Sequence, residues 1–474
     1  MKKSIINIGL IGFGTIGSGV VKVLQEKAKF FEEQLGLKLI LKWIVDKDIT
    51  TKRDVAVNPS TILSTNPDDI LKDEEIDVVI ELMGGYEPAR TFILTALRQG
   101  KNVITANKAL LAKYWDEIFL TANECGTQIY FEASVGGGIP IISSIRKGLI
   151  ANRITSIFGI INGTCNFILT KMEDEDKEFN QALKEAKKSG FAEADPALDI
   201  EGIDTSHKLT ILSSLAFNQC ISNNIYTEGI TSITKKDILY ARELGYAIKL
   251  LGIAKVVNDE LEVRVHPTMI PETHLLSGIK GVYNAIYVVG DLTGPLMFYG
   301  QGAGKLPTSS AVISDLINLI QELNNKAGEP ESTRLLKSRR AEEQKFLEHR
   351  SSAFCSSGFC SSALPPSALP WLKIKDMEEV RSKYYIRFSA LDKLGVLAAI
   401  SKILGEYDIS IASVIQKERG EGKPCGGKPQ GEIVPIIMLT HEAKEGNLKN
   451  ALEKIDKLET IKDKSLVIRV EEME

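Results

Sequence analysis

The feature that most constrains the fold is a glycine-rich turn near the start of the chain, between an apolar run and a helical pattern. Gly12, Gly14 and Gly17 lie in GLIGFGTIGSGVVKVL, which overlaps the β-branched run INIGLI. In such a turn the first glycine allows a tight bend, the second lets a phosphate approach the backbone, and the third lets the helix pack on the strand. The turn therefore predicts a dinucleotide phosphate site at a helix N-terminus, beside a parallel sheet.

The same first part of the chain alternates short β-branched runs with longer helical patterns. The runs are INIGLI, LKLILKWIV, IDVVIEL, NVITA and QIYFEA. Strands that alternate with helices form a parallel sheet covered on both faces. We therefore expect a Rossmann-type α/β domain over residues 1–135. The segment LPTSSAVISDLINLIQEL begins with a helix start signal, and we assign 306–330 to the same domain.

The rest of the chain changes character twice. Runs such as ITSIFGII and YNAIYVVG, separated by helical stretches, predict a mixed α/β substrate domain over 136–305. SSAFCSSGFCSSALPPSALP, at 351–370, has no regular pattern, so 331–380 is expected to be a linker. From YYIRFSA to SLVIRVEE, residues 381–474 follow the order of a ferredoxin-like βαββαβ domain.

Composition excludes several classes of protein. A net charge of −4 gives no general attraction to nucleic acid or to an anionic membrane. No apolar run reaches the roughly 18 residues of a membrane span. The six cysteines show neither a CxxC pair nor a paired His/Cys spacing, so neither a zinc site nor a disulfide framework is indicated. We expect a cytoplasmic protein that binds neither nucleic acid nor membrane.

An acidic residue at the end of the second strand would bind the adenosine ribose of a dinucleotide, and LILKWIVDKD supplies Asp46. Asp46 lies further along than the usual spacing of about 20 residues, because KAKFFEEQLGLK lengthens the first crossover. Asp46 favours NAD, whereas Lys47, Lys52 and Arg53 could receive the 2′-phosphate of NADP. The choice between NAD and NADP therefore stays open. The alternative role for Asp46 is that of an exposed carboxylate in a turn, without contact to a cofactor.

Six motifs, in order, resemble those of the homoserine dehydrogenase family. They are ELMGG at 81, TANKALLA at 105, EASVGGGIPII at 132, INGTCNFIL at 161, GFAEADPALDIEGIDTSHKL at 190 and YGQGAGKLPTSSAV at 299. The C-terminal unit resembles an ACT domain, a small fold that binds amino acids. The resemblance implies the long, feedback-regulated form of an enzyme that reversibly reduces L-aspartate 4-semialdehyde to L-homoserine with NAD(P)H, in threonine, methionine and isoleucine biosynthesis.

Asp204 and Lys208 are four residues apart at the start of a predicted helix, so they share a face and the carboxylate can orient the ammonium. When a hydride reaches an aldehyde carbon, the oxygen gains negative charge that a lysine can neutralise or protonate. The resemblance implies Lys208 as proton donor, with Lys108 in the same site and in contact with the cofactor. If the two lysines are close, each lowers the pKa of the other. An ordinary helix salt bridge is the alternative.

The resemblance also implies contacts to substrate and cofactor. Glu193 and Asp204 would bind the substrate, whose ammonium needs anionic partners, and Thr164 would line the same pocket unless INGTCN only forms a tight turn. Gly190 and Gly302 would meet the cofactor near its reactive end, or else only serve their loops. The rest of the expected cofactor site is the glycine turn with Asp46: Gly12, Phe13, Gly14, Thr15, Ile16 and Gly17.

EASVGGGIP raises the question of a metal ion. Carbonyl oxygens in a glycine-rich bend can coordinate a hard cation with little help from side chains. By resemblance, Glu132, Val135, Gly137 and Ile139 would hold a sodium ion, mostly through main-chain oxygens. A purely structural bend is the alternative.

Regulation and assembly are expected from the ACT resemblance. DKLG, at 392–395, leads into a predicted helix and could receive the carboxylate of an amino-acid effector, with threonine the expected one. An inert dimerisation domain is the alternative. The linker at 351–370 and ERGEGKPCGGKPQGE, at 418–432, depart from the family pattern, which leaves the coupling of this domain to catalysis open. The family and the ACT fold both favour a homodimer or a homotetramer.

Two rival functions are a sensor of nicotinamide and amino acids without turnover, and a dehydrogenase for another amino-acid semialdehyde. The combination of Lys108, Glu193, Asp204 and Lys208 argues against the sensor, because a sensor does not need a placed proton donor.

Overall fold

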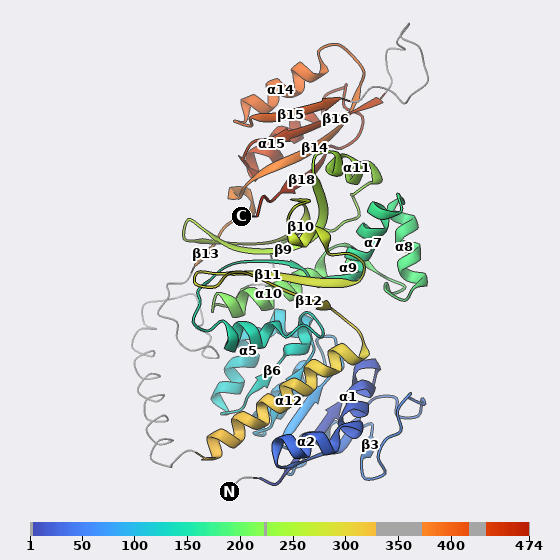
Figure 1. Cartoon of the computed structure of the whole chain (residues 1–474), viewed down its shortest axis with the longest axis vertical. Helices are drawn as coiled ribbons and strands as arrows, with labels where there is room; N and C mark the ends of the chain where they lie inside the picture. Colours follow the sequence, from blue (N-terminus) through green and yellow to red (C-terminus); the bar gives the residue numbers. More distant parts are fainter. Residues whose placement is uncertain (1–2, 222–224, 329–371, 417–432, 474) are drawn as a thin grey trace. The chain divides into compact units, whose positions relative to one another are not determined.

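The computed structural model describes residues 3–221, 225–328, 372–416 and 433–473 (Figure 1). They form two compact units. One is drawn from Met1–Ala151, Thr210–Asn223 and Gly300–Pro370, and the other from Asn152–Leu209, Asn224–Tyr299 and Trp371–Glu474. The segments 351–370 and 418–432, which depart from the family pattern, lie outside the described residues. Among the described helices, none has the length and apolarity to span a membrane.

The first unit contains a six-stranded sheet in which each strand runs parallel to its neighbours. In spatial order the strands are β3 (Ile62–Ser64), β2 (Lys38–Val45), β1 (Ile5–Ile11), β4 (Val78–Glu81), β5 (Asn102–Thr105) and β6 (Ile129–Tyr130). The strand order reverses between β1 and β4, and ligands of such sheets bind beyond the carboxyl ends of the strands at this reversal. The Rossmann-type prediction is confirmed.

Helices cover this sheet, and one of them comes from far along the chain. The longer ones are α1 (Thr15–Glu26), α2 (Ala28–Leu35), α4 (Ala89–Arg98), α5 (Lys108–Glu124) and α12 (Lys305–Gly328). Apolar residues of α12 at helical spacing, among them Val312, Leu316 and Ile320, share one buried core with Val20 and Val21 of α1. The predicted helix over 306–323 therefore forms, and it packs with the first unit.

The second unit contains a mixed sheet built around a long antiparallel hairpin. The hairpin strands are β9 (Tyr246–Val257) and β10 (Glu260–Pro271). Asn258 and Asp259 join them with positive φ angles of 53° and 60°, the conformation that a two-residue hairpin turn requires and that Asn and Asp tolerate. Beyond β9 the sheet continues through β7 (Ile154–Ile160), β11 (Tyr283–Gly290) and β12 (Gly294–Gln301).

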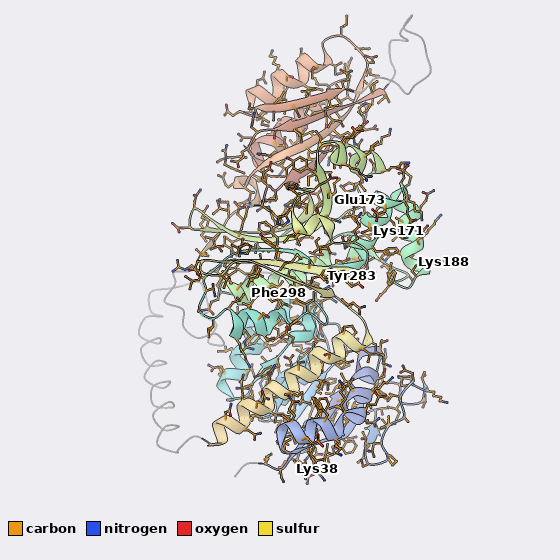
Figure 2. The ribbon with its side chains drawn as sticks, viewed as in Figure 1. Lys38, Lys171, Glu173, Lys188, Tyr283 and Phe298 are labelled. Atoms are coloured by element: carbon orange, nitrogen blue, oxygen red, sulfur yellow. The ribbon has the colours of Figure 1, made fainter. Side chains whose placement is uncertain are left out.

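Helices of the second unit carry the motifs that the sequence singled out. They are α7 (Gly163–Asp174), α8 (Phe179–Lys188), α9 (Ala197–Ile200), α11 (Lys235–Glu243) and the first half of α10 (Ile203–Ala216), which belongs to this unit up to Leu209. Lys171 and Glu173 lie on α7, and Lys188 ends α8 with its side chain exposed (Figure 2). The mixed α/β prediction is confirmed.

The C-terminal part of the second unit has the predicted βαββαβ order. Its elements are β14 (Arg381–Leu391), α14 (Val396–Glu406), β15 (Ile411–Gln416), β16 (Ile433–Thr440), α15 (Glu445–Ile455) and β18 (Leu466–Val470). Its strands lie in the order β18-β14-β16-β15, with antiparallel neighbours, and the helices close a core that includes Phe388, Ile400 and Leu448. This is the ferredoxin-like arrangement expected of an ACT domain.

No local pattern in the sequence predicts that the sheet of the ACT domain joins the sheet of the substrate domain. β18 pairs parallel with β10, with Thr268 opposite Arg469, so one sheet runs from β12 to β15. β13 (Lys373–Ile374) also pairs with β10, although its residues lie inside the expected linker, 331–380. A two-residue strand is too short to show a detectable periodicity in the sequence. The division into three domains and a linker remains a prediction.

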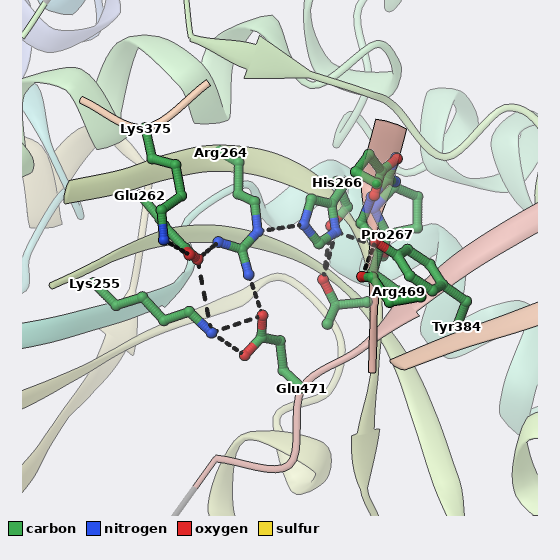
Figure 3. Close-up of polar contacts among 12 residues, drawn as sticks. Lys255, Glu262, Arg264, His266, Pro267, Lys375, Tyr384, Arg469 and Glu471 are labelled. Carbon is green, nitrogen blue, oxygen red and sulfur yellow. Dashed lines mark hydrogen bonds and ion pairs between the residues drawn. The ribbon is translucent and has the colours of Figure 1, made fainter. Parts of the chain in front are cut away.

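A network of buried charges lies where β10 meets the C-terminal strands (Figure 3). Arg264 is 1% exposed and bonds Glu262, 2.5 Å away, and Glu471, which follows β18. Glu471 also accepts from Lys255 of β9 at 2.7 Å, and Arg264 Nε donates to His266 Nε2 at 3.1 Å. Removing one member of such a network leaves a charge buried without a partner, which costs several kcal/mol.

His266 gives this network a pH dependence that can be measured. Burial, together with the positive charges of Arg469 and Arg264, holds the pKa of His266 well below its usual 6.5. As the pH falls below 6.5, the unfolded chain takes up a proton that the folded chain does not, so stability is lost. Between about pH 7.5 and about pH 5.5, this group should account for about 1.4 kcal/mol of that loss.

His266→Gln should therefore reduce the difference between the free energies of unfolding in urea at these two pH values. His441→Gln is the matched control, because His441 is exposed. The assignment is wrong if both variants keep the pH dependence of the parent protein.

Candidate active site

Asp204 and Lys208 form a buried ion pair at the start of α10. Lys208 Nζ lies 2.6 Å from Asp204 Oδ2 and donates a second bond, of 2.7 Å, to the carbonyl of Ile161. The two residues are only 8% and 9% exposed. A solvated helix salt bridge would leave both groups in water, so the structure favours a placed ammonium over a surface ion pair.

Asn162 holds the carboxylate of this pair. Its Oδ1 caps α7 by accepting from the backbone N–H of Cys165 at 2.8 Å. Its Nδ2 donates to Asp204 Oδ2 at 2.8 Å and to Asp199 Oδ1 at 2.7 Å. Sequence reasoning named neither Asn162 nor Asp199, although an asparagine before GTC is a helix N-cap signal. These bonds offset part of the cost of burying the ion pair.

Thr164 and Gly190 serve the segment that follows α8. Thr164 Oγ1 donates to the carbonyl of Phe191 at 2.7 Å, which ties α7 to this segment. Gly190 has a φ of +75° just after the end of α8, a conformation that favours glycine. Glu193 lies two residues beyond Phe191 and is exposed, where a charged ligand can reach it.

In the first unit, the glycine turn has the three properties expected of it. A Cβ on Gly12 would lie 2.7 Å from the carbonyl carbon of Leu82, and one on Gly17 would lie 2.1 Å from the oxygen of Gly12. Gly14 has no atom within 4 Å of its Cβ position, and it begins α1 without a side-chain cap. Packing therefore requires two of the glycines, while Gly14 leaves the helix N-terminus open to an anion.

Asp46 is half-buried and fixed against this turn. It accepts from the backbone N–H of Phe13 at 2.5 Å and from that of Asp48 at 2.9 Å. Arg53 Nε donates to the carbonyl of Phe13 at 2.8 Å, with its guanidinium 5.6 Å from the centre of the Phe13 ring. A carboxylate and a guanidinium thus meet at one turn, a pair that suits either NAD or NADP.

Two motifs meet at the carboxyl ends of β4 and β5. Glu81, which is fully buried, accepts from Thr105 Oγ1 at 2.6 Å and from the backbone N–H of Met83 at 2.7 Å. Burial raises the pKa of Glu81, and these bonds oppose that rise. Asn107 donates to Thr105 Oγ1 and caps α5, of which Lys108 is the first residue. This network fixes the start of α5 and therefore the position of Lys108. Sequence reasoning did not name Glu81 as a site residue, and its only signal in the sequence is the motif ELMGG that it begins.

The EASVGGGIP bend packs tightly against the loop of Gly302. Gly137 has a φ of +56°, and a Cβ there would lie 2.5 Å from the carbonyl carbon of Gly302. The Glu132 carboxylate accepts from the backbone N–H groups of Ile142 and Ser143, both at 2.8 Å, so it is engaged at the start of a short helix. Within the described residues, no group of three or more His, Cys, Asp or Glu could hold a metal ion.

Comparison with known proteins decides the family. Residues 140–317 match the family model described as homoserine dehydrogenase, and residues 12–132 match its NAD-binding domain. The homoserine dehydrogenase of Neisseria gonorrhoeae is 39% identical over 469 residues, which cover 99% of each chain. The chain belongs to the homoserine dehydrogenase family. The homoserine dehydrogenase of Bacillus subtilis is 36% identical over 467 residues, 98% of each chain.

Solved structures agree with this assignment. A homoserine dehydrogenase from Thiobacillus denitrificans is 42% identical, with a TM-score of 0.83, covering 99% of this chain and 98% of that one. A hyperthermophilic archaeal homoserine dehydrogenase in complex with NADPH is 26% identical, with a TM-score of 0.57, covering 67% of this chain and 98% of that one. Residues 384–460 match the ACT domain model. The predicted family, an oxidoreductase family with a C-terminal ACT domain, is confirmed.

The glycine turn of this homoserine dehydrogenase family member can be tested with a matched pair of variants. Gly14→Ala should leave stability nearly unchanged, because the Cβ position is empty, but should weaken NAD(P)H binding at least tenfold by blocking the approach of the phosphate. Gly17→Ala should lower the free energy of unfolding by about 1–3 kcal/mol, because its Cβ would overlap the Gly12 carbonyl.

Thermal unfolding and fluorescence titration with NADH and NADPH measure the two effects. Equal losses of stability in both variants would contradict the separate roles of these glycines.

Proposed function

We propose that this protein catalyses the reversible reduction of L-aspartate 4-semialdehyde to L-homoserine with NADH or NADPH, in the biosynthesis of threonine, methionine and isoleucine. Family membership over nearly the whole chain supports this proposal. The observation that carries the chemistry is the buried Asp204–Lys208 pair.

Lys208 is the proposed proton donor. NAD(P)H, when bound, would supply the hydride for the aldehyde carbon. The carbonyl oxygen becomes an alkoxide, and the Lys208 ammonium neutralises and protonates it. Of the three N–H bonds of this ammonium, those directed to Asp204 and Ile161 orient it, and we assign the third to the substrate oxygen.

The other proposed roles follow the family pattern. Glu193 and Asp204 bind the substrate, and Thr164 lines the same pocket. Lys108 is a second lysine of the site that also contacts the cofactor. Asp204 is already bonded to Lys208 and Asn162, so its contact with substrate would be shared. Gly12, Phe13, Gly14, Thr15, Ile16, Gly17, Asp46, Gly190 and Gly302 complete the proposed cofactor contacts.

The remaining proposals concern the ion, the effector and the assembly. Glu132, Val135, Gly137 and Ile139 would hold a sodium ion, mostly through main-chain oxygens. Gly395, with a φ of +87°, begins α14, so the turn 392–395 precedes a helix N-terminus that suits the carboxylate of threonine. We also propose a cytoplasmic homodimer or homotetramer with the three domains and the linker given above.

The test of the proton donor compares two buried lysines. Lys208→Met should lower kcat by at least a thousandfold while NADPH binding stays within about twofold, because a thioether cannot donate a proton. Lys249→Met is the control. Lys249 is fully buried in β9, and its Nζ donates to the carbonyl of Ile279 at 2.9 Å. This variant should keep kcat within about threefold.

Rates with L-aspartate 4-semialdehyde and with a panel of other amino-acid semialdehydes test the function itself. A faster rate with another semialdehyde would support the rival dehydrogenase. Tight cofactor binding without turnover on any of them would support the sensor.

A further inference from the structure

A buried arginine of the ACT domain contacts the substrate domain. Arg469, in β18, is 4% exposed. Its Nη1 lies 2.7 Å from Glu228 Oε2, its Nη2 donates to the hydroxyl of Tyr226 at 2.8 Å, and its Nε donates to Glu445 Oε2 at 3.0 Å. The guanidinium also lies 4.9 Å from the centre of the Tyr226 ring. Two of these partners, Glu228 and Tyr226, belong to the substrate domain.

Tyr226 and Glu228 belong to a segment that is bonded to β10 and packs against residues 200 and 201. Tyr226 lies in the two-residue strand β8 (Tyr226–Thr227), which pairs parallel with β10, and the backbone N–H of Glu228 donates to the carbonyl of Val265 at 2.8 Å. The next residue, Gly229, packs so closely on residues 200 and 201 that a Cβ there would lie 2.0 Å from the oxygen of Ile200.

Contacts of residues 228–230 with residues 200–202 connect β8 to the first turn of α10, which carries Asp204 of the ion pair. The backbone N–H of Ile230 donates to the Ile200 carbonyl at 2.8 Å, and a Cβ on Gly202 would lie 3.2 Å from the oxygen of Glu228. Gly202 in turn accepts from the backbone N–H of Ser206 at 2.9 Å, a bond of the first turn of α10, which contains Asp204. A displacement of β8 must therefore displace the start of α10.

We propose that Arg469 is a positioning residue for Asp204 and Lys208, which it controls through Glu228 and the packed turn 200–202. The inference rests on the proposed function only in taking Lys208 as the proton donor. It assigns the ACT domain a part in the geometry of the site even when no amino acid is bound to that domain.

A second contact between the same two domains provides the control. Arg387 Nε lies 2.6 Å from Asp237 Oδ1, and the hydroxyl of Tyr385 donates to the same oxygen at 3.1 Å. Asp237 is fully buried in the first turn of α11. This contact likewise joins a carboxylate of the substrate domain to an ACT arginine, but it ends on α11 and not on the turn that precedes α10.

The experiment compares Arg469→Lys and Glu228→Gln with Arg387→Lys in the full-length protein. The first two variants should lower kcat about tenfold and alter its pH profile, with the KM values for semialdehyde and NADPH within about twofold. Arg387→Lys should keep kcat and the pH profile, although it also weakens an ion pair between the domains. Glu228→Gln should cost less stability than Arg469→Lys, because Glu228 is 31% exposed. It therefore still tests the inference if Arg469→Lys does not fold.

Hydrogen exchange supplies a readout that needs no turnover. The backbone amides of residues 203–209 should exchange faster in Arg469→Lys and Glu228→Gln than in the parent protein. In Arg387→Lys their exchange rates should equal those of the parent protein. The inference is overturned if all three variants behave alike in exchange. A parent protein without semialdehyde reductase activity would refute the proposed function, and the exchange result would still decide whether Arg469 controls the start of α10.

Discussion

The second unit depends on one strand, β10, and on how its two edges are used. One edge pairs along its whole length with β9. The other edge pairs in succession with β13, β8 and β18, which come from three distant parts of the chain. An unpaired strand edge is a site for unwanted association, so these short strands also protect β10. Through them, β10 holds together β18 of the ACT domain, β13 of the expected linker and β8, which precedes α11.

Charge burial follows from this use of β10. Glu262, Arg264 and His266 alternate along the strand, so they point to the same side of the sheet. Each is almost completely buried. The partners that offset the cost of burying the charges of Arg264 and Glu262 come from other parts of the chain: Glu471 follows β18, and Lys375 follows β13. The ion pair of Asp204 and Lys208 obeys the same rule on a smaller scale, since Asn162 and the Ile161 carbonyl supply the additional bonds. In both places a buried charge is held by several partners at once.

The sequence was informative wherever a local pattern specifies a structure. Gly12, Gly14 and Gly17 predicted the turn between β1 and α1, and the spacing of Asp204 and Lys208 predicted a shared helix face. It was uninformative where distant residues meet. Strand β3 has three residues and β8 and β13 have two each, too few for a periodic pattern. The bonds from Asn162 to Asp199 and Asp204 depend on how α7, α9 and α10 pack, and no motif spacing encodes that packing.

The pairing of β10 with β18 also constrains how the chain can fold as it is synthesised. β10 leaves the ribosome long before β18, so the part of its edge that carries Thr268 and Met269 stays unpaired through most of the later synthesis. During that interval Arg264 lacks the carboxylate of Glu471. The substrate domain therefore completes its sheet only together with the ACT domain. Premature termination between the two would yield a chain with an open strand edge, in which Arg264 keeps Glu262 but lacks Glu471.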